Sequence, residues 1–219
     1  MLTKWGSYCL INKWMGMDTI INTIPGYRVY EYLLVLNTHE DLRNKIMQIK
    51  KDFFEKYEAS TAMGKPYVPL VSFVQYGLME DRIVNRLRVV AMGATPFKVE
   101  LKDFGSFPSH TIYINVATRV PVQDLVKTIR HETQRLMKLN EDNKPHFILE
   151  PHLTIARKLK PWQYEKGWLE YSNKDFSGRF IADSMVLLKR PSGEMKYQVA
   201  NRFEFLNMPV ATKQGELFG

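Results

Sequence analysis

The sequence predicts an α+β fold built from largely antiparallel sheets. Segments of strand character and of helix character mix along the chain, and hairpin-length links join several of the strands. The length of 219 residues suits one domain with a sizeable core, built as two lobes. We therefore expect a single bilobal domain over 27–210, an N-terminal extension over 1–26 and a C-terminal tail over 211–219.

The first half of the chain carries four segments of strand pattern and two of helix pattern. Residues 29–36 are rich in β-branched and aromatic side chains, and 97–104 alternate between apolar and charged residues. Leu42, Ile46 and Phe53 recur at helical spacing. In chain order, we expect a strand over 29–36, a helix from Thr38 or Asp41 to about Tyr57, a strand over 67–76, a helix over 80–90, and strands over 97–104 and 111–116.

The second half continues the alternation. Pro121 suits the first turn of a helix, and the sequence Pro191-Ser192-Gly193-Glu194 is typical of a turn between strands. We expect a helix from Pro121 to about Asn140, a strand over 147–157, a helical segment over 162–171, and strands over 180–189 and 197–205.

Composition limits the classes of function. The 31 Lys and Arg residues outnumber the 23 Asp and Glu residues, giving a net charge of +8, which favours polyanionic partners such as RNA or nucleotides. Solubility alone explains such a charge equally well. The single cysteine, Cys9, cannot form an internal disulfide, and no apolar run approaches the roughly 20 residues of a membrane helix. We expect a cytoplasmic protein without a membrane partner.

One short motif carries chemistry. Alternation along a strand places His152, Thr154 and Ala156 on one face, and Leu153, Ile155 and Arg157 on the other. An imidazole that titrates near neutrality can transfer protons, and a neighbouring hydroxyl can hold a phosphate oxygen. A buried, hydrogen-bonded structural histidine is the alternative interpretation of this pattern.

A second segment shares the frame of this motif. Lys65-Pro66-Tyr67-Val68-Pro69-Leu70 and Glu150-Pro151-His152-Leu153-Thr154-Ile155 share the pattern Pro-aromatic-aliphatic-x-aliphatic, 85 positions apart (67 to 152). They look like two copies of one element.

The segment from Pro151 to Arg157, Pro-His-Leu-Thr-Ile-Ala-Arg, resembles the second signature of the two-histidine (2H) phosphoesterases, in particular the 2′-5′ RNA ligase-like branch. The resemblance implies two lobes related by an approximate two-fold axis, with helices outside and one His-x-Thr strand from each lobe lining a central cleft. It implies that His152 acts as general acid or base on a 2′,3′-cyclic or 2′-5′ phosphodiester, and that Thr154 binds the phosphate. No metal and no cofactor is needed.

The first signature of that family is altered here. Tyr67 stands where the first histidine belongs, and Pro69 where the hydroxyl residue belongs. At neutral pH only about one tyrosine in a thousand is phenolate, a handicap of roughly 4 kcal/mol for a base, although a phenol can still donate a hydrogen bond. Pro69 offers neither a hydroxyl nor a backbone N–H. The sequence therefore predicts a degenerate first motif.

Other residues are weaker candidates for substrate binding. They are His110, which opens a strand, Arg157, which belongs to the family signature although alternation points it away from His152, and Phe73, in the wall of the cleft. A plain surface or structural role is the alternative for His110. Tyr164 and Trp168 could stack on bases, but their helical spacing favours packing.

Two functions remain open from the sequence. The chain is a phosphoesterase of the 2′-5′ RNA ligase-like or 2′,3′-cyclic phosphodiesterase type, with activity weakened or lost at Tyr67 and Pro69, or it is a non-catalytic protein that binds RNA or a nucleotide. A scaffold that now serves an unrelated protein interaction is a third possibility. We expect a monomer.

Overall fold

The computed structural model describes residues 26–60 and 64–208, so the expected N-terminal extension (apart from Gly26) and the C-terminal tail lie outside the described residues. Strands and helices mix as predicted, and the strands pair antiparallel throughout. In chain order the elements are β1 (Val29–Asn37), α2 (Glu40–Tyr57), β2 (Tyr67–Tyr76), the 3-10 helix η2 (Gly77–Met79), α3 (Glu80–Gly93), β3 (Phe97–Phe107), β4 (Thr111–Val116), α4 (Arg119–Met137), β5 (His146–Phe147), β6 (His152–Ala156), α5 (Pro161–Tyr171), β7 (Ser177–Ala182), β8 (Ser184–Pro191) and β9 (Gln198–Glu204).

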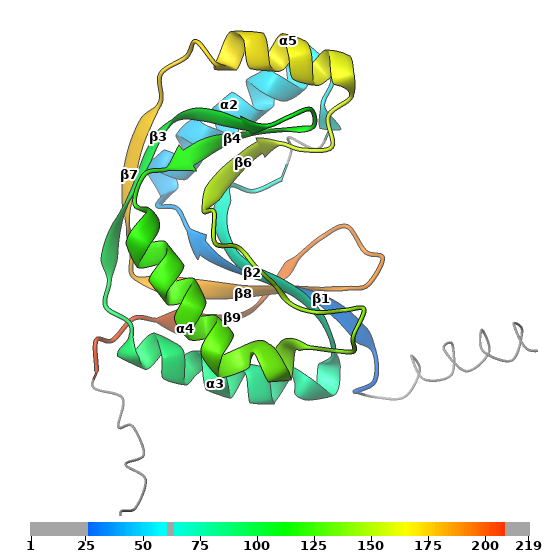
Figure 1. Cartoon of the computed structure of the whole chain (residues 1–219), viewed down its shortest axis with the longest axis vertical. Helices are drawn as coiled ribbons and strands as arrows, with labels where there is room; N and C mark the ends of the chain where they lie inside the picture. The colour runs from blue at the N-terminus through cyan, green and yellow to red at the C-terminus, as the bar shows by residue number, and fades with distance from the viewer. Residues whose placement is uncertain (1–25, 61–63, 209–219) are drawn as a thin grey trace, which may run out of the picture.

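The strands form two sheets, one in each lobe. The first sheet has the strand order β5-β2-β1-β8-β9, and the second has the order β6-β4-β3-β7. Figure 1 shows the two sheets as the arms of a C, with α3 and α4 outside the first sheet and α2 and α5 outside the second. We call the side of each sheet that faces away from its helices the inner face. The α+β class, the two antiparallel sheets and the outer helices confirm the predicted fold.

Each sheet is covered in part by a helix from the other half of the chain. Helix α2 lies between β1 and β2 in sequence but packs against β6 and β7, and α4 follows β4 but packs against β2. Helix α2 is amphipathic, and its apolar residues Leu42, Ile46 and Phe53 are buried against the second sheet. The acidic residues Glu40 and Asp41 in its first turn interact favourably with the positive end of the helix dipole. The two lobes are therefore interlocked.

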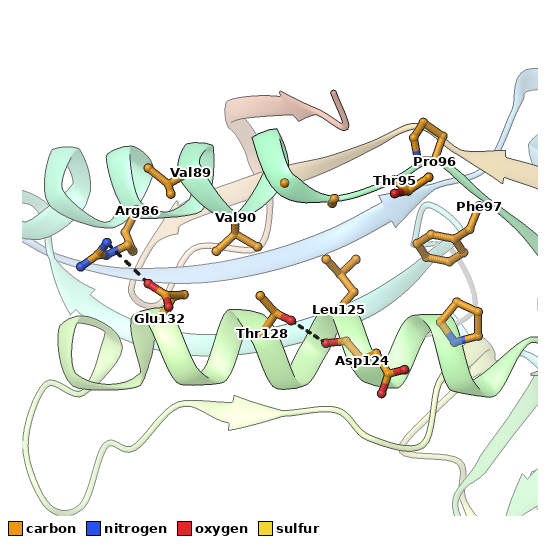
Figure 2. A pocket seen from close by; sticks show the side chains of 13 residues that line it. Arg86, Val89, Val90, Thr95, Pro96, Phe97, Asp124, Leu125, Thr128 and Glu132 are labelled. Carbon is orange, nitrogen blue, oxygen red and sulfur yellow. Dashed lines mark hydrogen bonds and ion pairs between the residues drawn. The ribbon is translucent and has the colours of Figure 1, made fainter. Parts of the chain in front are cut away.

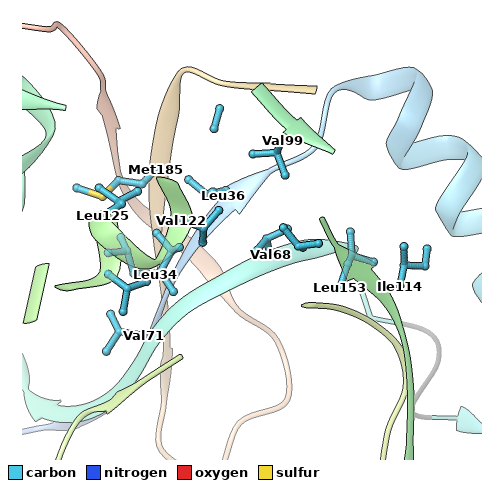
Figure 3. Close-up of a cluster of buried hydrophobic side chains, with 14 of the residues drawn as sticks. Leu34, Leu36, Val68, Val71, Val99, Ile114, Val122, Leu125, Leu153 and Met185 are labelled. Carbon is cyan, nitrogen blue, oxygen red and sulfur yellow. The ribbon is translucent and has the colours of Figure 1, made fainter. Parts of the chain in front are cut away.

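One continuous core joins the lobes. Buried side chains of both sheets and of the covering helices belong to one hydrophobic cluster, part of which Figure 3 shows. Val68 of β2 and Leu153 of β6 are both 0% exposed in this cluster, and β2 lies against β6. These two residues occupy equivalent positions in the two copies of the repeated element, so both copies contribute the same position to the shared core.

Several boundaries differ from the prediction. The expected strand over 180–189 is two strands, because the chain passes from the second sheet to the first between β7 and β8 at Asp183. The expected strand over 147–157 is also divided, into β5 and β6, which belong to different sheets. Apolar content alone does not reveal such a change of sheet. Within the described ranges, none of the helices has the length and apolarity that crossing a bilayer requires.

Candidate functional site

The two copies of the repeated element lie side by side at the junction of the lobes. In β6, Leu153 is fully buried, whereas His152 and Thr154 on the opposite side of the strand are half-buried. In β2, Val68 is fully buried, whereas Tyr67 and Pro69 are half-buried. Because β2 contacts β6, the structure brings both pairs of motif residues to the inner side of the same strand junction.

A bulge follows the motif in β6. Ile112 of β4 pairs with Ala156 and Tyr113 pairs with Thr154, so Ile155 has no partner of its own. Ile155 and Ala156 are consequently both 0% exposed, and the alternation of side chains reverses after them. The prediction that Ala156 shares a face with His152 is therefore wrong. The same reversal brings the exposed Arg157 to the side of Thr154, which strict alternation did not predict.

The copy of the element in β2 carries the same irregularity at the equivalent place. Val35 pairs with Pro69 and Leu34 pairs with Val71, so Leu70 is the additional residue, and both Leu70 and Val71 are 0% exposed. This bulge also explains a correction. Without it Phe73 would share the face of Tyr67, but Phe73 is 4% exposed and stacks on Tyr32 in the core, with ring centroids 4.9 Å apart. Phe73 therefore does not line the inner face.

A buried lysine holds the bulge of β6 from behind. Lys50 of α2 is 3% exposed, and its Nζ donates hydrogen bonds to the carbonyl oxygens of Thr154 at 2.9 Å and Ile155 at 3.1 Å. Desolvation, and to a smaller extent the positive charge of Arg157, lower the pKa of Lys50 to about 8. The lysine thus satisfies two carbonyls that the irregular pairing frees, and it fixes the backbone of the motif.

His152 is packed against two aromatic rings and hydrogen-bonded to the backbone. Its ring lies 5.1 Å from the ring of Phe107 and 5.1 Å from that of Tyr113, centroid to centroid. Nδ1 lies 2.8 Å from the carbonyl oxygen of Glu150, and because a carbonyl only accepts, Nδ1 carries the hydrogen. Burial lowers the pKa of His152, an effect that the hydrogen bond to Glu150 opposes. The neutral ring therefore keeps a lone pair on Nε2 for proton transfer.

Tyr67 lies among cationic and phenolic groups. Burial raises the pKa of Tyr67, while the positive charges of Arg157 and Arg190 act in the opposite direction. Arg190 also donates through Nε to Glu31 at 2.9 Å, and its guanidinium lies 4.5 Å from the ring centroid of Tyr197. A tyrosine whose pKa is raised stays a neutral phenol at physiological pH. Tyr67 can thus donate a hydrogen bond on the inner face, where its counterpart His152 can accept a proton.

The remaining predicted residues lie farther from this junction. His110 is exposed in the turn before β4, and its Nδ1 donates to the carbonyl oxygen of Pro108 at 3.1 Å. His152 pairs with Asn115 at the other end of β4, about five residues or roughly 16 Å along the strand. Tyr164 and Trp168 of α5 pack against the core, as their helical spacing predicted.

Two cavities differ in their relation to the motif. A polar cavity of about 270 Å³ adjoins His152 and is lined by side chains of β3, β4, α4 and the loop before β6. A larger cavity of about 940 Å³ lies between α3, α4 and the start of β3, where apolar side chains such as Val90 and Leu125 and the ion pair of Arg86 with Glu132 line it (Figure 2). That cavity is on the outer side of the first sheet. We therefore take the smaller one as part of the candidate site.

Sequence reasoning missed Lys50, Arg190 and Tyr197. A signal for Lys50 exists, since it occupies the apolar stripe of α2 between Ile46 and Phe53, where a lysine is out of place. Arg190 and Tyr197 lie in and after β8, far along the chain from either motif, and carry no local pattern that marks them. Among the described residues, no group of three or more His, Cys, Asp or Glu side chains could hold a metal ion.

Curated relatives share moderate sequence similarity with this chain. A Bacillus pumilus protein named "Putative phosphoesterase" is 25% identical over 123 residues, which cover 52% of this chain and 65% of that protein, so the match spans less than two thirds of its length. A Bacillus licheniformis protein of the same descriptive name is 23% identical over 154 residues, covering 66% of this chain and 83% of that protein.

Solved structures share the fold. The protein TT0787 of Thermus thermophilus superposes with a TM-score of 0.61 at 15% identity, over 80% of this chain and 98% of that chain. LigT of E. coli, crystallised with 3′-AMP, gives a TM-score of 0.55 at 13% identity, over 81% and 98%. A family model described as the 2′-5′ RNA ligase superfamily matches residues 38–194, which include both copies of the repeated element. The chain therefore belongs to the 2′-5′ RNA ligase superfamily of two-histidine phosphoesterases.

Proposed function

We propose that this chain is a phosphoesterase that acts on the phosphodiesters of RNA or nucleotides, of the 2′,3′-cyclic phosphodiesterase or 2′-5′ RNA ligase-like type, with turnover reduced by the altered first motif. The proposal is supported chiefly by His152 and Thr154, half-buried on β6 with the hydrogen of the His152 ring on Nδ1, and by the contact of β6 with β2, the strand that carries Tyr67.

The chemistry assigns a different task to each side chain. Nε2 of His152 takes the proton of the attacking water as its oxygen bonds to phosphorus, and the Thr154 hydroxyl holds a phosphate oxygen. The P–O bond to the leaving ribose oxygen then breaks, and that oxygen needs a proton. Tyr67 offers a neutral phenol there, but its raised pKa makes it a weak acid. Loss of a matched acid commonly costs about 10²- to 10⁴-fold in rate, which accounts for the reduced turnover.

Substitution of His152 tests the catalytic assignment. We expect His152→Ala to lower kcat/KM for 2′,3′-cyclic nucleotides by about 100-fold, because the variant loses the proton acceptor. Initial rates of ring opening measured by chromatography check this. The matched control is His131→Ala, which removes an exposed histidine of α4; its Nδ1 lies 2.9 Å from Oε1 of Glu132. A rate that survives His152→Ala, or that falls instead in His110→Ala, would refute the role of His152.

A second candidate is a non-catalytic protein that binds RNA or a nucleotide on the same inner face. The observation in its favour is the double loss at Tyr67 and Pro69, next to the retained cations Arg157 and Arg190. Under this alternative the cyclic nucleotides bind but do not turn over.

Salt dependence tests the electrostatic binding that both candidates require. If Arg157 and Arg190 neutralise two phosphates of single-stranded RNA, the plot of log K against log salt has a slope of about −1.4, and Arg157→Gln lowers its magnitude by about 0.7. Fluorescence titrations at several salt concentrations measure this slope. Arg82→Gln on the exposed side of α3 is the control and should leave the slope unchanged. Binding without any salt dependence would contradict phosphate recognition.

A further inference from the structure

The polar cavity beside His152 has no task in the proposed chemistry. It measures about 270 Å³, slightly below the roughly 300–1,000 Å³ of pockets for drug-sized ligands, so it suits a single small ring system. Its polar lining residues are Asn115 at the end of β4, Arg119 and Gln123 in the first turns of α4, and Glu150 in the loop before β6.

Two amide groups in this lining have fixed orientations. Nδ2 of Asn115 donates to the carbonyl oxygen of Asp103 at 3.3 Å, and Nε2 of Gln123 donates to the carbonyl oxygen of Leu149 at 2.8 Å. Each bond uses one of the two N–H groups of its amide and fixes the end of the side chain at which the oxygen lies. Across the described ranges, neither Oδ1 of Asn115 nor Oε1 of Gln123 accepts a side-chain or backbone hydrogen bond, so both oxygens remain available as acceptors for a ligand.

The charge pattern favours a neutral occupant over a second phosphate. The two amide oxygens and the carboxylate of Glu150 repel an anion, whereas Arg119 is the one arginine or lysine in the lining that attracts it. A neutral ligand with hydrogen-bond donors can bond to these acceptors, while Arg119 can donate a hydrogen bond to a ring nitrogen or carbonyl oxygen of the same ligand. An amino group beside a ring acceptor fits this arrangement.

Aromatic side chains complete the lining. Phe107 and Tyr113 border both the cavity and the His152 ring, with their own centroids 4.7 Å apart. Gly105 is adjacent to this lining. A Cβ atom at this position would stand 2.5 Å from Cε2 of Tyr113 and 2.8 Å from Oδ1 of Asn115, so only glycine allows these side chains their positions. Flat apolar surfaces next to edge-reading polar groups are typical of sites for unstacked nucleobases.

We infer that this cavity is a nucleobase subsite that selects bases with an exocyclic amino group, such as cytosine or adenine, over uracil or hypoxanthine. The inference rests on the proposed function, because the base belongs to the nucleotide whose phosphate lies at His152 and Thr154. It adds a specificity that the motif does not supply: Gln123 and Asn115 accept hydrogen bonds from the amino group.

Matched pairs of nucleotides test the subsite directly. Cytidine and uridine 3′-monophosphates differ at ring position 4 and in the proton on N3, and adenosine and inosine 3′-monophosphates differ in the same manner at position 6. One or two net hydrogen bonds correspond to about 2- to 10-fold each in affinity. We expect calorimetric titration of the full chain to show at least about fivefold tighter binding of the cytidine and adenosine compounds.

Variants separate base recognition from phosphate binding. Gln123→Leu and Asn115→Leu should each reduce the cytidine-to-uridine ratio to below about twofold, while the affinity for inorganic phosphate stays unchanged. Gln134→Leu, three turns further along α4 and exposed, is the matched control and should keep the ratio.

The outcomes distinguish the two proposals. Equal affinities of the unmodified chain for cytidine and uridine compounds, or a preference for uridine, would overturn the subsite and leave the proposed function standing as long as phosphodiester turnover or binding is found. A cytidine preference that persists in both leucine variants would also overturn it. Absence of any nucleotide binding would overturn the subsite together with the proposed function.

Discussion

The double variant Tyr67→His with Pro69→Thr is expected to hydrolyse 2′,3′-cyclic nucleotides about 10²- to 10⁴-fold faster than the unmodified chain, measured as kcat/KM. The substitutions supply the imidazole that can protonate the leaving oxygen near neutral pH, and a hydroxyl for the phosphate. The threonine also restores a backbone N–H that proline lacks.

The backbone favours this result. Tyr67 and Pro69 are half-buried on the inner side of β2, and the bulge at Leu70 matches that at Ile155, so the new side chains enter the frame that already holds His152 and Thr154 in β6. Tyr76→His, at the far end of the same strand, is the control and should bring no gain. A double variant that folds, binds nucleotide and remains as slow as the unmodified chain would show that the altered first motif is not what limits turnover.

Replacement of Lys50 should change how stability depends on pH. A pKa of about 8 in place of the ordinary 10.5 corresponds to about 3 kcal/mol of destabilisation while the amine is charged in the folded chain. Below about pH 8 both folded and unfolded chains hold the proton, and the folded chain bears this cost in full. Between pH 8 and 10.5 the folded chain releases the proton and the unfolded chain keeps it, so stability rises with pH.

We therefore expect the free energy of unfolding of the unmodified chain, minus that of Lys50→Met, to increase by about 3 kcal/mol from pH 7 to pH 11. At pH 7 the variant also loses the two hydrogen bonds to Thr154 and Ile155, about 1–3 kcal/mol for each carbonyl left unsatisfied, which offsets the relief of removing the charge. Urea unfolding over this pH range measures the difference. Lys51→Met, the exposed neighbour, is the control; an identical pH profile for the two variants would contradict a charge buried at Lys50.

The sequence predicted most elements because their patterns are local. The stripe of α2 and the alternation of β3 each reflect one buried face, and His152-x-Thr154 was recognisable by its residues alone. The two bulges could not be predicted, because Leu70 and Val71, like Ile155 and Ala156, are apolar on either side of the irregularity. That one-residue shift determines which side Phe73 and Arg157 take.

Residues that meet only in the folded chain were also beyond a local pattern. Arg190 acts on the pKa of Tyr67 although the strand register places Arg190 across Glu31 from Val74, at the opposite end of β2 from Tyr67. Gln123 meets His152 around one cavity because α4 begins beside the end of β4. Neither association has a sequence spacing that distinguishes it from chance.

The exchange of helices between the lobes has a consequence for how such a protein assembles. Strand β6 has its covering helix α2 from the first half of the chain, and β2 has its covering helix α4 from the second half. When only the first half of a nascent chain has left the ribosome, the apolar stripe of α2 is therefore exposed, because the strands β6 and β7 that cover it have not yet been made. Folding of either lobe must wait for nearly the whole chain, because β9 completes the first sheet and β7 completes the second.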